Sequence, residues 1–394
     1  MIWDFQRHQV EGANWALATI RKHGLAYLTW QERTRKSGTA LLTVELSKAK
    51  TCLIITKKKA IPGWMEHLDN HLLTKKYTVI NYESIHKIVD TFDFIVLDEA
   101  HHAISGFPKR SKTWLKVAKV CKGKPILFLS ATPYAEHIGL IYNQLKMSRW
   151  TPFKELTGYD FFANYGISFK KRTPYGLQET YSKFHTDRVL AKMIHLFNFK
   201  TRAEVGIEHE PSVKVVYIEL SNQTKEWLKE WKKHRVIEIK GHVIAGDSDP
   251  KMRTVHYQLE GGTVKVNDRI TIRTGELEKI NYIKDNYDTT QIAIMAHFIE
   301  ERELLKLHFP DMPIYSSDGD AEGVDLSHIS KLLVYSMSFK TSKHTQRMAR
   351  QANHDRKTPI EVDVLVTKDP GVGYKVYNTV AIKKENFIKS SYEL

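Results

Sequence analysis

Five short apolar runs in the first third of this chain limit its possible folds more than any other feature. They are almost uninterrupted by polar residues, and helix-like stretches such as "SGTALLTVELSKA" separate several of them. A strand that is apolar on both faces must be covered on both faces, which is typical of a parallel sheet between two layers of helices. The predicted strands are residues 25–30, 51–56, 77–82, 92–99 and 125–132.

The pattern changes near residue 146 and returns near residue 276. Between these points helix-like stretches are mixed with short strands, and beyond them apolar runs such as "QIAIMAHF" alternate with helices again. The sequence therefore predicts an α/β protein with two parallel-sheet domains, residues 1–145 and 276–394. Residues 146–275 are predicted to be an inserted helical and strand segment that contacts nucleic acid.

The charge of the chain favours a polyanionic partner. Its 394 residues include 60 Lys and Arg against 45 Asp and Glu, a net charge of +15. Nucleic acid is the first candidate partner, and a purely solubilising charge is the alternative. Residues 170–202 concentrate eight basic residues against two acidic ones. This segment is either a nucleic-acid surface, beginning with Lys170, Lys171 and Arg172, or a solvated linker.

Several residues favour a plain structural interpretation. Cys52 and Cys121 lie in apolar runs, so we predict buried core residues and no cysteine-based metal cluster. Trp64, at a helix start, is favoured as a core anchor over a base-stacking residue. The N-terminus has no signal-peptide pattern, and no apolar run approaches the ~18 residues of a membrane span. We expect a cytoplasmic monomer without a membrane partner.

Two adjacent carboxylates, Asp98 and Glu99, follow the fourth apolar run in "FIVLDEAHHA". In a parallel sheet the active crevice lies at the carboxyl ends of the strands. There Asp98 could hold Mg²⁺, and Glu99 could orient or deprotonate an attacking water. The next strand ends in "LFLSATPY", where the hydroxyl groups of Ser130 and Thr132 could contact the acidic pair and relay a nucleotide-dependent change.

These motifs and their order resemble superfamily 2 helicases of the DEAD/DEAH-box type, above all the Swi/Snf-like and phage-type DNA helicases. "FQRHQVEGANWAL" resembles the glutamine motif that reads adenine, with Gln9 at the matching position. "IITKKKAIPGW" resembles the motif that touches the nucleic-acid backbone, through Thr56 and Lys57. "VINYES" resembles the next strand-end motif. By the same resemblance, His101 couples the nucleotide site to the Ser-Ala-Thr motif.

The resemblance continues in the last quarter of the chain. "AEGVDLS" resembles motif V, and "HTQRMARQANHDR" resembles motif VI, which carries an arginine finger. The matching residues are Gly323 and Asp325 in motif V, and Gln346, Arg350 as the finger and Arg347 as its alternate in motif VI. The fold implied is a pair of RecA-like domains with ATP and Mg²⁺ between them and a nucleic-acid strand across both.

The phosphate loop departs from the family pattern. It should be rich in glycine and end in Gly-Lys-Ser/Thr, whereas the equivalent stretch here is "WQERTRKSGTALL". Lys36 and Ser37 stand at the places of the phosphate lysine and the Mg²⁺ hydroxyl, between Thr34 and Gly38. Arg35 stands where glycine is expected, because backbone N–H groups must approach the phosphates without a Cβ in the way.

The resemblance implies an ATP-dependent DNA helicase or translocase. Lys36 would neutralise the β- and γ-phosphates, Ser37 and Asp98 would hold Mg²⁺, Glu99 would activate water, and Arg350 would stabilise the transferred phosphoryl group. Two alternatives stay open. Arg35 could have ended catalysis and left a nucleic-acid-binding protein, or the substrate could be RNA. A phage origin, which the resemblance and the small size suggest, would place the protein in the host cytoplasm.

Overall fold

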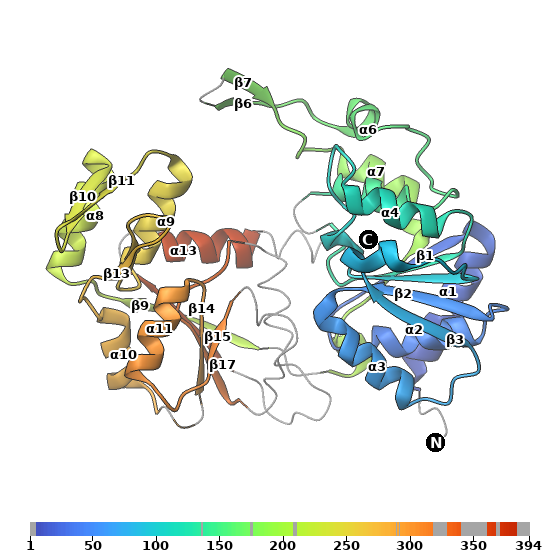
Figure 1. The fold of residues 1–394 in the computed structure, drawn as a ribbon, viewed down its shortest axis with the longest axis horizontal. Helices are drawn as coiled ribbons and strands as arrows, with labels where there is room; N and C mark the ends of the chain where they lie inside the picture. Colours follow the sequence, from blue (N-terminus) through green and yellow to red (C-terminus); the bar gives the residue numbers. More distant parts are fainter. Residues whose placement is uncertain are drawn as a thin grey trace. The chain divides into compact units, whose positions relative to one another are not determined.

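The computed structural model describes residues 5–134, 137–173, 176–207, 211–288, 290, 292–317, 329–339, 361–367 and 371–383. The chain divides into two compact units between Gly206 and Ile207, and each unit has its own parallel sheet (Figure 1). Motifs V and VI, with Gly323, Asp325, Gln346, Arg347 and Arg350, lie outside the described residues.

The first unit is built on a six-stranded sheet with helices on both faces (Figure 1). Its strand order is β3-β2-β4-β5-β1-β8, and every neighbouring pair is parallel. Five of these strands correspond to the five predicted apolar runs. The strands are β1 (Leu25–Trp30), β2 (Thr51–Thr56), β3 (Lys76–Asn81), β4 (Phe94–Asp98), β5 (Ile126–Leu129) and β8 (Phe197–Lys200).

Helices of the first unit bury apolar stripes against this sheet. Ala16 and Ile20 of α1 pack with Ala40 and Val44 of α2 around Trp30, which is fully buried. Cys52 and Cys121 are buried and unpaired, as predicted. The helices are α1 (Arg7–His23), α2 (Lys36–Glu45), α3 (Ile61–Asp69), α4 (Lys112–Cys121), α5 (Leu140–Leu145), α6 (Gly158–Tyr165) and α7 (Thr186–Met193). Short 3₁₀ turns are η1 (Lys58–Ala60), η2 (Tyr82–Lys87), η3 (Ala100–His102), η4 (Ile194–Leu196) and η5 (Ala203–Val205).

A two-stranded antiparallel hairpin, β6 (Lys170–Thr173) and β7 (Gly176–Glu179), lies in the chain between α6 and α7. It belongs to neither large sheet. Lys170 is exposed, and so are the apolar side chains of Phe169 and Leu177. The hairpin therefore presents cationic and apolar groups to solvent together.

The second unit contains a five-stranded sheet of order β15-β14-β16-β17-β9, again parallel throughout. The strands are β9 (Ser212–Ile218), β14 (Ile292–Ala296), β15 (Ile314–Ser316), β16 (Lys331–Val334) and β17 (Glu361–Thr367). Its described helices include α10 (Glu278–Asn286), α11 (Ile299–His308) and α13 (Val372–Tyr377), the last followed by a π-helical turn, η6 (Asn378–Lys383). Among the described helices of both units, none has the length and apolar character needed to cross a bilayer.

A smaller element is inserted between β9 and α10. It has its own apolar core around Trp231, which is fully buried. The element consists of α8 (Asn222–His234), the hairpin β10 (Val236–Ile239) and β11 (His242–Ala245), α9 (Asp249–Leu259), and the hairpin β12 (Thr263–Lys265) and β13 (Thr271–Arg273).

The predicted fold class, α/β with two parallel-sheet domains, is confirmed, and it is consistent with the RecA-like pair that the resemblance implies. The predicted middle segment, residues 146–275, is shared between the two units, which divide between Gly206 and Ile207. β8 completes the first sheet and β9 completes the second, so the insertion into the second unit is shorter than expected. Both strands lie at sheet edges and are partly exposed, so neither has the continuous apolar run that marks a central strand.

Candidate active site

Three adjacent strands of the first sheet, β4, β5 and β1, bring the candidate residues to one edge. Asp98 ends β4, and Glu99 leads directly into η3. Ser130 follows β5, and residues 31–35 follow β1 and lead into α2. Because the carboxyl ends of parallel strands meet at one edge, segments separated by almost 100 residues converge there.

The loop between β1 and α2 has an unusual backbone. Arg33 has φ 66° and Arg35 has φ 62°, so both occupy the left-handed region. Arg35 is the residue preceding the first turn of α2, and its side chain is exposed. Left-handed backbone costs a residue with a Cβ about 1 kcal/mol, whereas glycine adopts it freely. The position at which glycine was expected therefore has a left-handed backbone, which glycine adopts freely, with an arginine in it.

Helix α1 holds this loop through two side chains. His8 Nε2 lies 3.1 Å from the Thr34 carbonyl oxygen, and Gln9 Nε2 donates to the Arg35 carbonyl oxygen at 3.4 Å. Gln9 is buried, and a Cβ on Gly38 would lie 2.8 Å from its Nε2. Gly38 therefore makes room for Gln9, and the predicted adenine-reading glutamine is part of the support of the loop.

The side chain of Lys36 folds back and hydrogen-bonds to the start of its own loop. Its Nζ donates to the carbonyl oxygens of Trp30 at 2.7 Å and Gln31 at 2.8 Å. Burial lowers the pKa of Lys36, while the nearby charges of Glu32 and Glu99 favour its ammonium form. An ammonium held by its own loop in this way could turn to an anion bound at the loop's N–H groups.

Asp98 is fixed by its neighbours. Its Oδ2 accepts hydrogen bonds from Thr56 Oγ1 at 2.7 Å and from Trp64 Nε1 at 3.0 Å. The Tyr82 hydroxyl donates to the Asp98 carbonyl oxygen at 2.8 Å. Both side-chain donors use the same carboxylate oxygen, which orients the carboxylate at the strand end.

These contacts change the interpretation of Thr56. It was expected to touch the nucleic-acid backbone, but it is fully buried and donates its hydroxyl to Asp98. Five consecutive residues at the end of β2 are buried, so both faces of this strand are covered and its last side chain is buried as well. Lys57, the next residue, is half-buried, and its charge lowers the pKa of Glu99, so it lies near the acidic pair. Trp64 is 2% exposed, in line with its predicted role as a core anchor.

Glu99 has the environment of a proton acceptor. Its backbone is left-handed, with φ 51°. Burial raises the pKa of Glu99 to about 7, with a further contribution from Asp98, while Lys57 and Lys36 oppose the rise. A carboxyl group that titrates near neutral pH can both take up and release a proton under ordinary conditions, as general base catalysis requires.

His101 links Glu99 to the end of β5. Its Nδ1 lies 2.9 Å from Ser130 Oγ and 3.4 Å from Glu99 Oε2, and its Nε2 lies 3.4 Å from Thr132 Oγ1. The Thr132 N–H donates to Ser130 Oγ at 3.0 Å. The structure thus brings together the three predicted coupling residues, His101, Ser130 and Thr132.

Three residues that were not singled out from the sequence also hold the loop. The Gln31 N–H donates to the Lys200 carbonyl oxygen, and the Arg202 N–H donates to Gln31 Oε1 at 2.7 Å. The Arg202 guanidinium lies 3.7 Å from Glu32 Oε2, and both side chains are largely buried. Arg202 had been counted in the basic segment 170–202. Its place beside the loop follows from the pairing of β8 with β1, which no sequence signal indicated.

Ser37 and Asp98 have the chemistry for a hard cation. Ser37 is half-buried in the first turn of α2, and Asp98 presents an oriented carboxylate. Hydroxyl and carboxylate oxygens are the protein ligands that Mg²⁺ accepts. The charges of Asp98 and Glu99 both act on Lys36, so the loop and the acidic pair lie within electrostatic reach. These residues therefore fit a magnesium-bound phosphate group.

The strain at Arg35 can be measured with two variants. We expect Arg35→Gly to be more stable than Arg35→Ala by on the order of 1 kcal/mol, because only glycine adopts φ 62° without a Cβ penalty. Both variants lose the guanidinium group, so their difference isolates the backbone effect. Chemical unfolding of the two purified variants measures it. Equal stability would mean that this position is not strained.

Comparison with known proteins gives one family match. Residues 32–135 match the family described as "Type III restriction enzyme, res subunit", which supports a superfamily 2 helicase-type segment there. No curated protein matches the chain. A solved structure described as "Sulfolobus solfataricus SWI2/SNF2 ATPase core domain" is similar over 97% of this chain and 89% of that chain, at 13% identity and a TM-score of 0.43.

Proposed function

We propose that this protein hydrolyses ATP and uses the reaction to move on or remodel DNA. The observation that carries the proposal is the meeting, at one sheet edge, of the Lys36 loop with Asp98 and Glu99, and the link from Glu99 through His101 to Ser130. The family match over residues 32–135 covers most of this arrangement. Phosphoryl transfer needs positioning and charge neutralisation more than covalent chemistry, and these residues supply both.

Each residue has a stated role in the proposal. Thr34, Arg35, Lys36 and Gly38 contact the nucleotide phosphates, and Lys36 turns from its own loop to them. Ser37 and Asp98 hold Mg²⁺, which when bound neutralises phosphate charge. Glu99 takes a proton from the attacking water, as its pKa of about 7 permits. Gln9, anchored against the loop, reads the adenine.

The remaining proposed nucleotide contacts come from the second unit. Arg350 is proposed to stabilise the transferred phosphoryl group, with Arg347 as the alternate. Gly323, Asp325 and Gln346 complete the set. Only the resemblance supports these roles, because the residues lie outside the described part of the chain.

The hairpin β6–β7 is the proposed nucleic-acid contact, through Lys170, Lys171 and Arg172. Lys183 Nζ lies 4.5 Å from the centre of the exposed Phe169 ring, beside the same strand. Cations close to an exposed aromatic ring suit a polymer with charged phosphates and flat bases. The net charge of +15 supports the same partner. Lys57 is proposed as a further backbone contact.

A single set of assays tests the proposal. We expect the wild type to hydrolyse ATP faster when DNA is added, and Lys36→Ala to lose at least about a hundredfold in rate, because one phosphate-neutralising charge is removed. Lys48→Ala, at an exposed lysine beyond α2, is the matched control and should retain the wild-type rate.

The alternatives give different results in these assays. A protein whose ATPase was ended by Arg35 would bind DNA in a salt-sensitive manner without hydrolysis, and ATP would not change the binding. An RNA helicase would be stimulated more by RNA than by DNA of the same sequence. If Lys36→Ala hydrolysed ATP as fast as the wild type, the proposed site would be wrong.

A further inference from the structure

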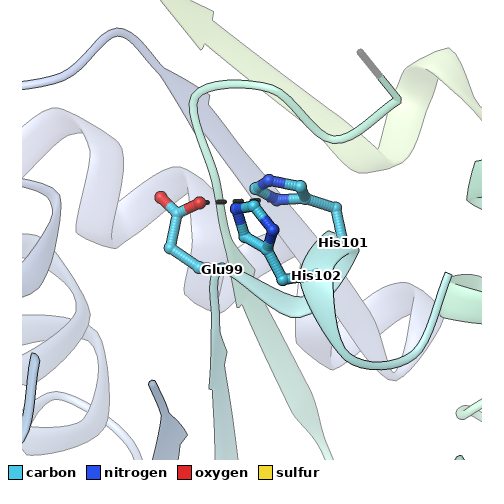
Figure 2. A group of neighbouring side chains, drawn as sticks. All are labelled: Glu99, His101 and His102. Carbon is cyan, nitrogen blue, oxygen red and sulfur yellow. Dashed lines mark ion pairs between the residues drawn. The ribbon is translucent and has the colours of Figure 1, made fainter. Parts of the chain in front are cut away.

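The segment after β4 gathers a third titratable side chain that the proposed reaction does not use. His102 follows His101 in η3, and the centres of the two rings lie 3.9 Å apart. Figure 2 shows the Glu99 carboxylate pointing toward both rings. One ligand atom from each of Glu99, His101 and His102 lies within 4.8 Å of the others. Two imidazoles and a carboxylate are therefore within reach of one point.

The distances suit a small transition-metal ion. On a tetrahedral ion with bonds of about 2.1 Å, two ligand atoms lie about 3.4 Å apart. The distance from His101 Nδ1 to Glu99 Oε2 is 3.4 Å, so two ligands already have this spacing. The third, from His102, must move closer by about 1 Å or slightly more. His102 is exposed, so a small side-chain rotation can provide this movement without repacking.

The surroundings of His101 also suit a metal ligand. With the proton on Nε2, the ring faces Thr132 Oγ1 through that nitrogen and presents the lone pair of Nδ1 to Ser130 and Glu99. A ligating histidine commonly has its second nitrogen oriented by a neighbouring acceptor in this way. An ion can therefore enter from the exposed side of His102 while His101 and Glu99 keep their present positions.

We propose that Glu99, His101 and His102 bind a zinc-class transition-metal ion, and that this ion inhibits the proposed ATPase. Two imidazole nitrogens select Zn²⁺ and similar ions over Mg²⁺, which takes oxygen ligands. The inhibitory site is therefore distinct in chemistry from the proposed Ser37–Asp98 magnesium site, although it lies beside it. A water molecule would fill the fourth position.

The ion would inhibit hydrolysis because it would bind atoms that the proposed reaction needs. Glu99 Oε2 would be bound to the ion and could not accept a proton from water. His101 Nδ1 would exchange its contact with Ser130 Oγ, 2.9 Å away, for the metal, so the Ser130 part of the link to the end of β5 would be lost while the Nε2 contact with Thr132 remained. The inhibitory consequence rests on the proposed function, whereas metal binding itself does not.

The test uses Co²⁺, which absorbs visible light strongly when tetrahedral, and a variant outside the proposed machinery. We expect the full-length wild type to bind one Co²⁺ that Zn²⁺ displaces, and His102→Ala to bind at least about tenfold more weakly. His234→Ala, at an exposed histidine in α8, is the control and should bind as the wild type does. Melting curves check that both variants are folded.

The activity arm adds Zn²⁺ to ATP hydrolysis in excess Mg²⁺ and thiol-free buffer. We expect Zn²⁺ to inhibit the wild type, and His102→Ala to keep its basal rate and need at least about tenfold more Zn²⁺ for the same inhibition. Wild type without a Co²⁺ site, or with one that His102→Ala leaves unchanged, would overturn the metal site. Weaker Co²⁺ binding with unchanged inhibition would overturn the regulation. If no variant hydrolysed ATP, the proposed function would fail, and the Co²⁺ titration would still decide the site.

Discussion

Replacing Glu99 by glutamine is expected to lower the rate of ATP hydrolysis by at least about a hundredfold and, in the same variant, to make the first unit more stable above pH 7. The loss of activity follows because an amide cannot accept the proton of the attacking water. Loop contacts of Lys36, Gln9 and His8 do not involve Glu99, so nucleotide binding should persist. Steady-state hydrolysis and nucleotide titration measure the two properties separately.

The gain in stability has a defined pH dependence. Burial raises the pKa of Glu99 from 4.5 to about 7, so between these pH values the folded protein binds the proton more tightly than the unfolded chain does. Wild-type stability therefore falls as pH rises from about 4.5 to about 7, and the glutamine variant escapes this loss. We expect the variant to be more stable by about 3 kcal/mol at pH 8 and by almost nothing near pH 4.5.

Glu66→Gln, at an exposed position in α3, is the control for this experiment and should change neither property. The wild-type rate of hydrolysis should also fall as pH drops below 7, because Glu99 becomes protonated. A glutamine variant that was active but more stable at pH 8 would show that the half-buried Glu99 does not act as the proton acceptor. One that was inactive and no more stable would show that the carboxyl group is not desolvated.

The central strands and the acidic pair could be predicted from the sequence because each depends on a local pattern. Continuous apolar runs marked β1 to β5, and "DEAHH" at a strand end marked Asp98 and Glu99. The edge strand β8 was not recognised, because it has four residues and three of them are partly exposed. The run "VKVVYIEL", which contains most of β9, was predicted as a short strand of the middle segment but not as part of the second sheet. An apolar run can therefore locate a strand, as it did for the edge strand β3, but it does not tell which sheet the strand joins.

The support of the site was harder to predict than its reacting groups. Thr56 and Trp64 both donate to Asp98, although one had been expected on the nucleic-acid surface and the other in the core. Arg202 contacts Glu32 across 170 residues of sequence. Such contacts depend on which strands are neighbours, and strand order was not part of the prediction. Residue types at strand ends indicate where the reacting groups lie. Only the strand order tells which other side chains contact and orient those groups.

Replacing Glu260 by alanine is expected to destabilise the second unit by about 3 kcal/mol or more. Glu260 is 1% exposed, and its two carboxylate oxygens accept hydrogen bonds from the N–H groups of Val372 and Gly373 at the start of α13. Its Oε1 also lies 3.3 Å from His256 Nε2. The substitution leaves two buried N–H groups without their acceptor, and it removes the contact between the end of α9 and α13.

Substitution of Glu260 is expected to be costly because the backbone at the start of α13 approaches its carboxylate closely. A Cβ on Gly371 would lie 2.0 Å from Thr367 Oγ1 and 3.2 Å from both carboxylate oxygens of Glu260, so the glycine lets the backbone pass close to both side chains. Glu260→Gln should be less damaging than alanine, because its amide oxygen can still accept one of the two hydrogen bonds. Glu226→Ala, at an exposed position in α8, is the matched control. Chemical unfolding of the full chain measures all three variants. Equal stability of Glu260→Ala and Glu226→Ala would mean that α13 does not depend on this carboxylate. Other contacts of the inserted element with the second unit, such as the hydrogen bonds from Tyr335 Oη to the Gly261 carbonyl oxygen and from the Met337 N–H to Tyr257 Oη, would then be sufficient.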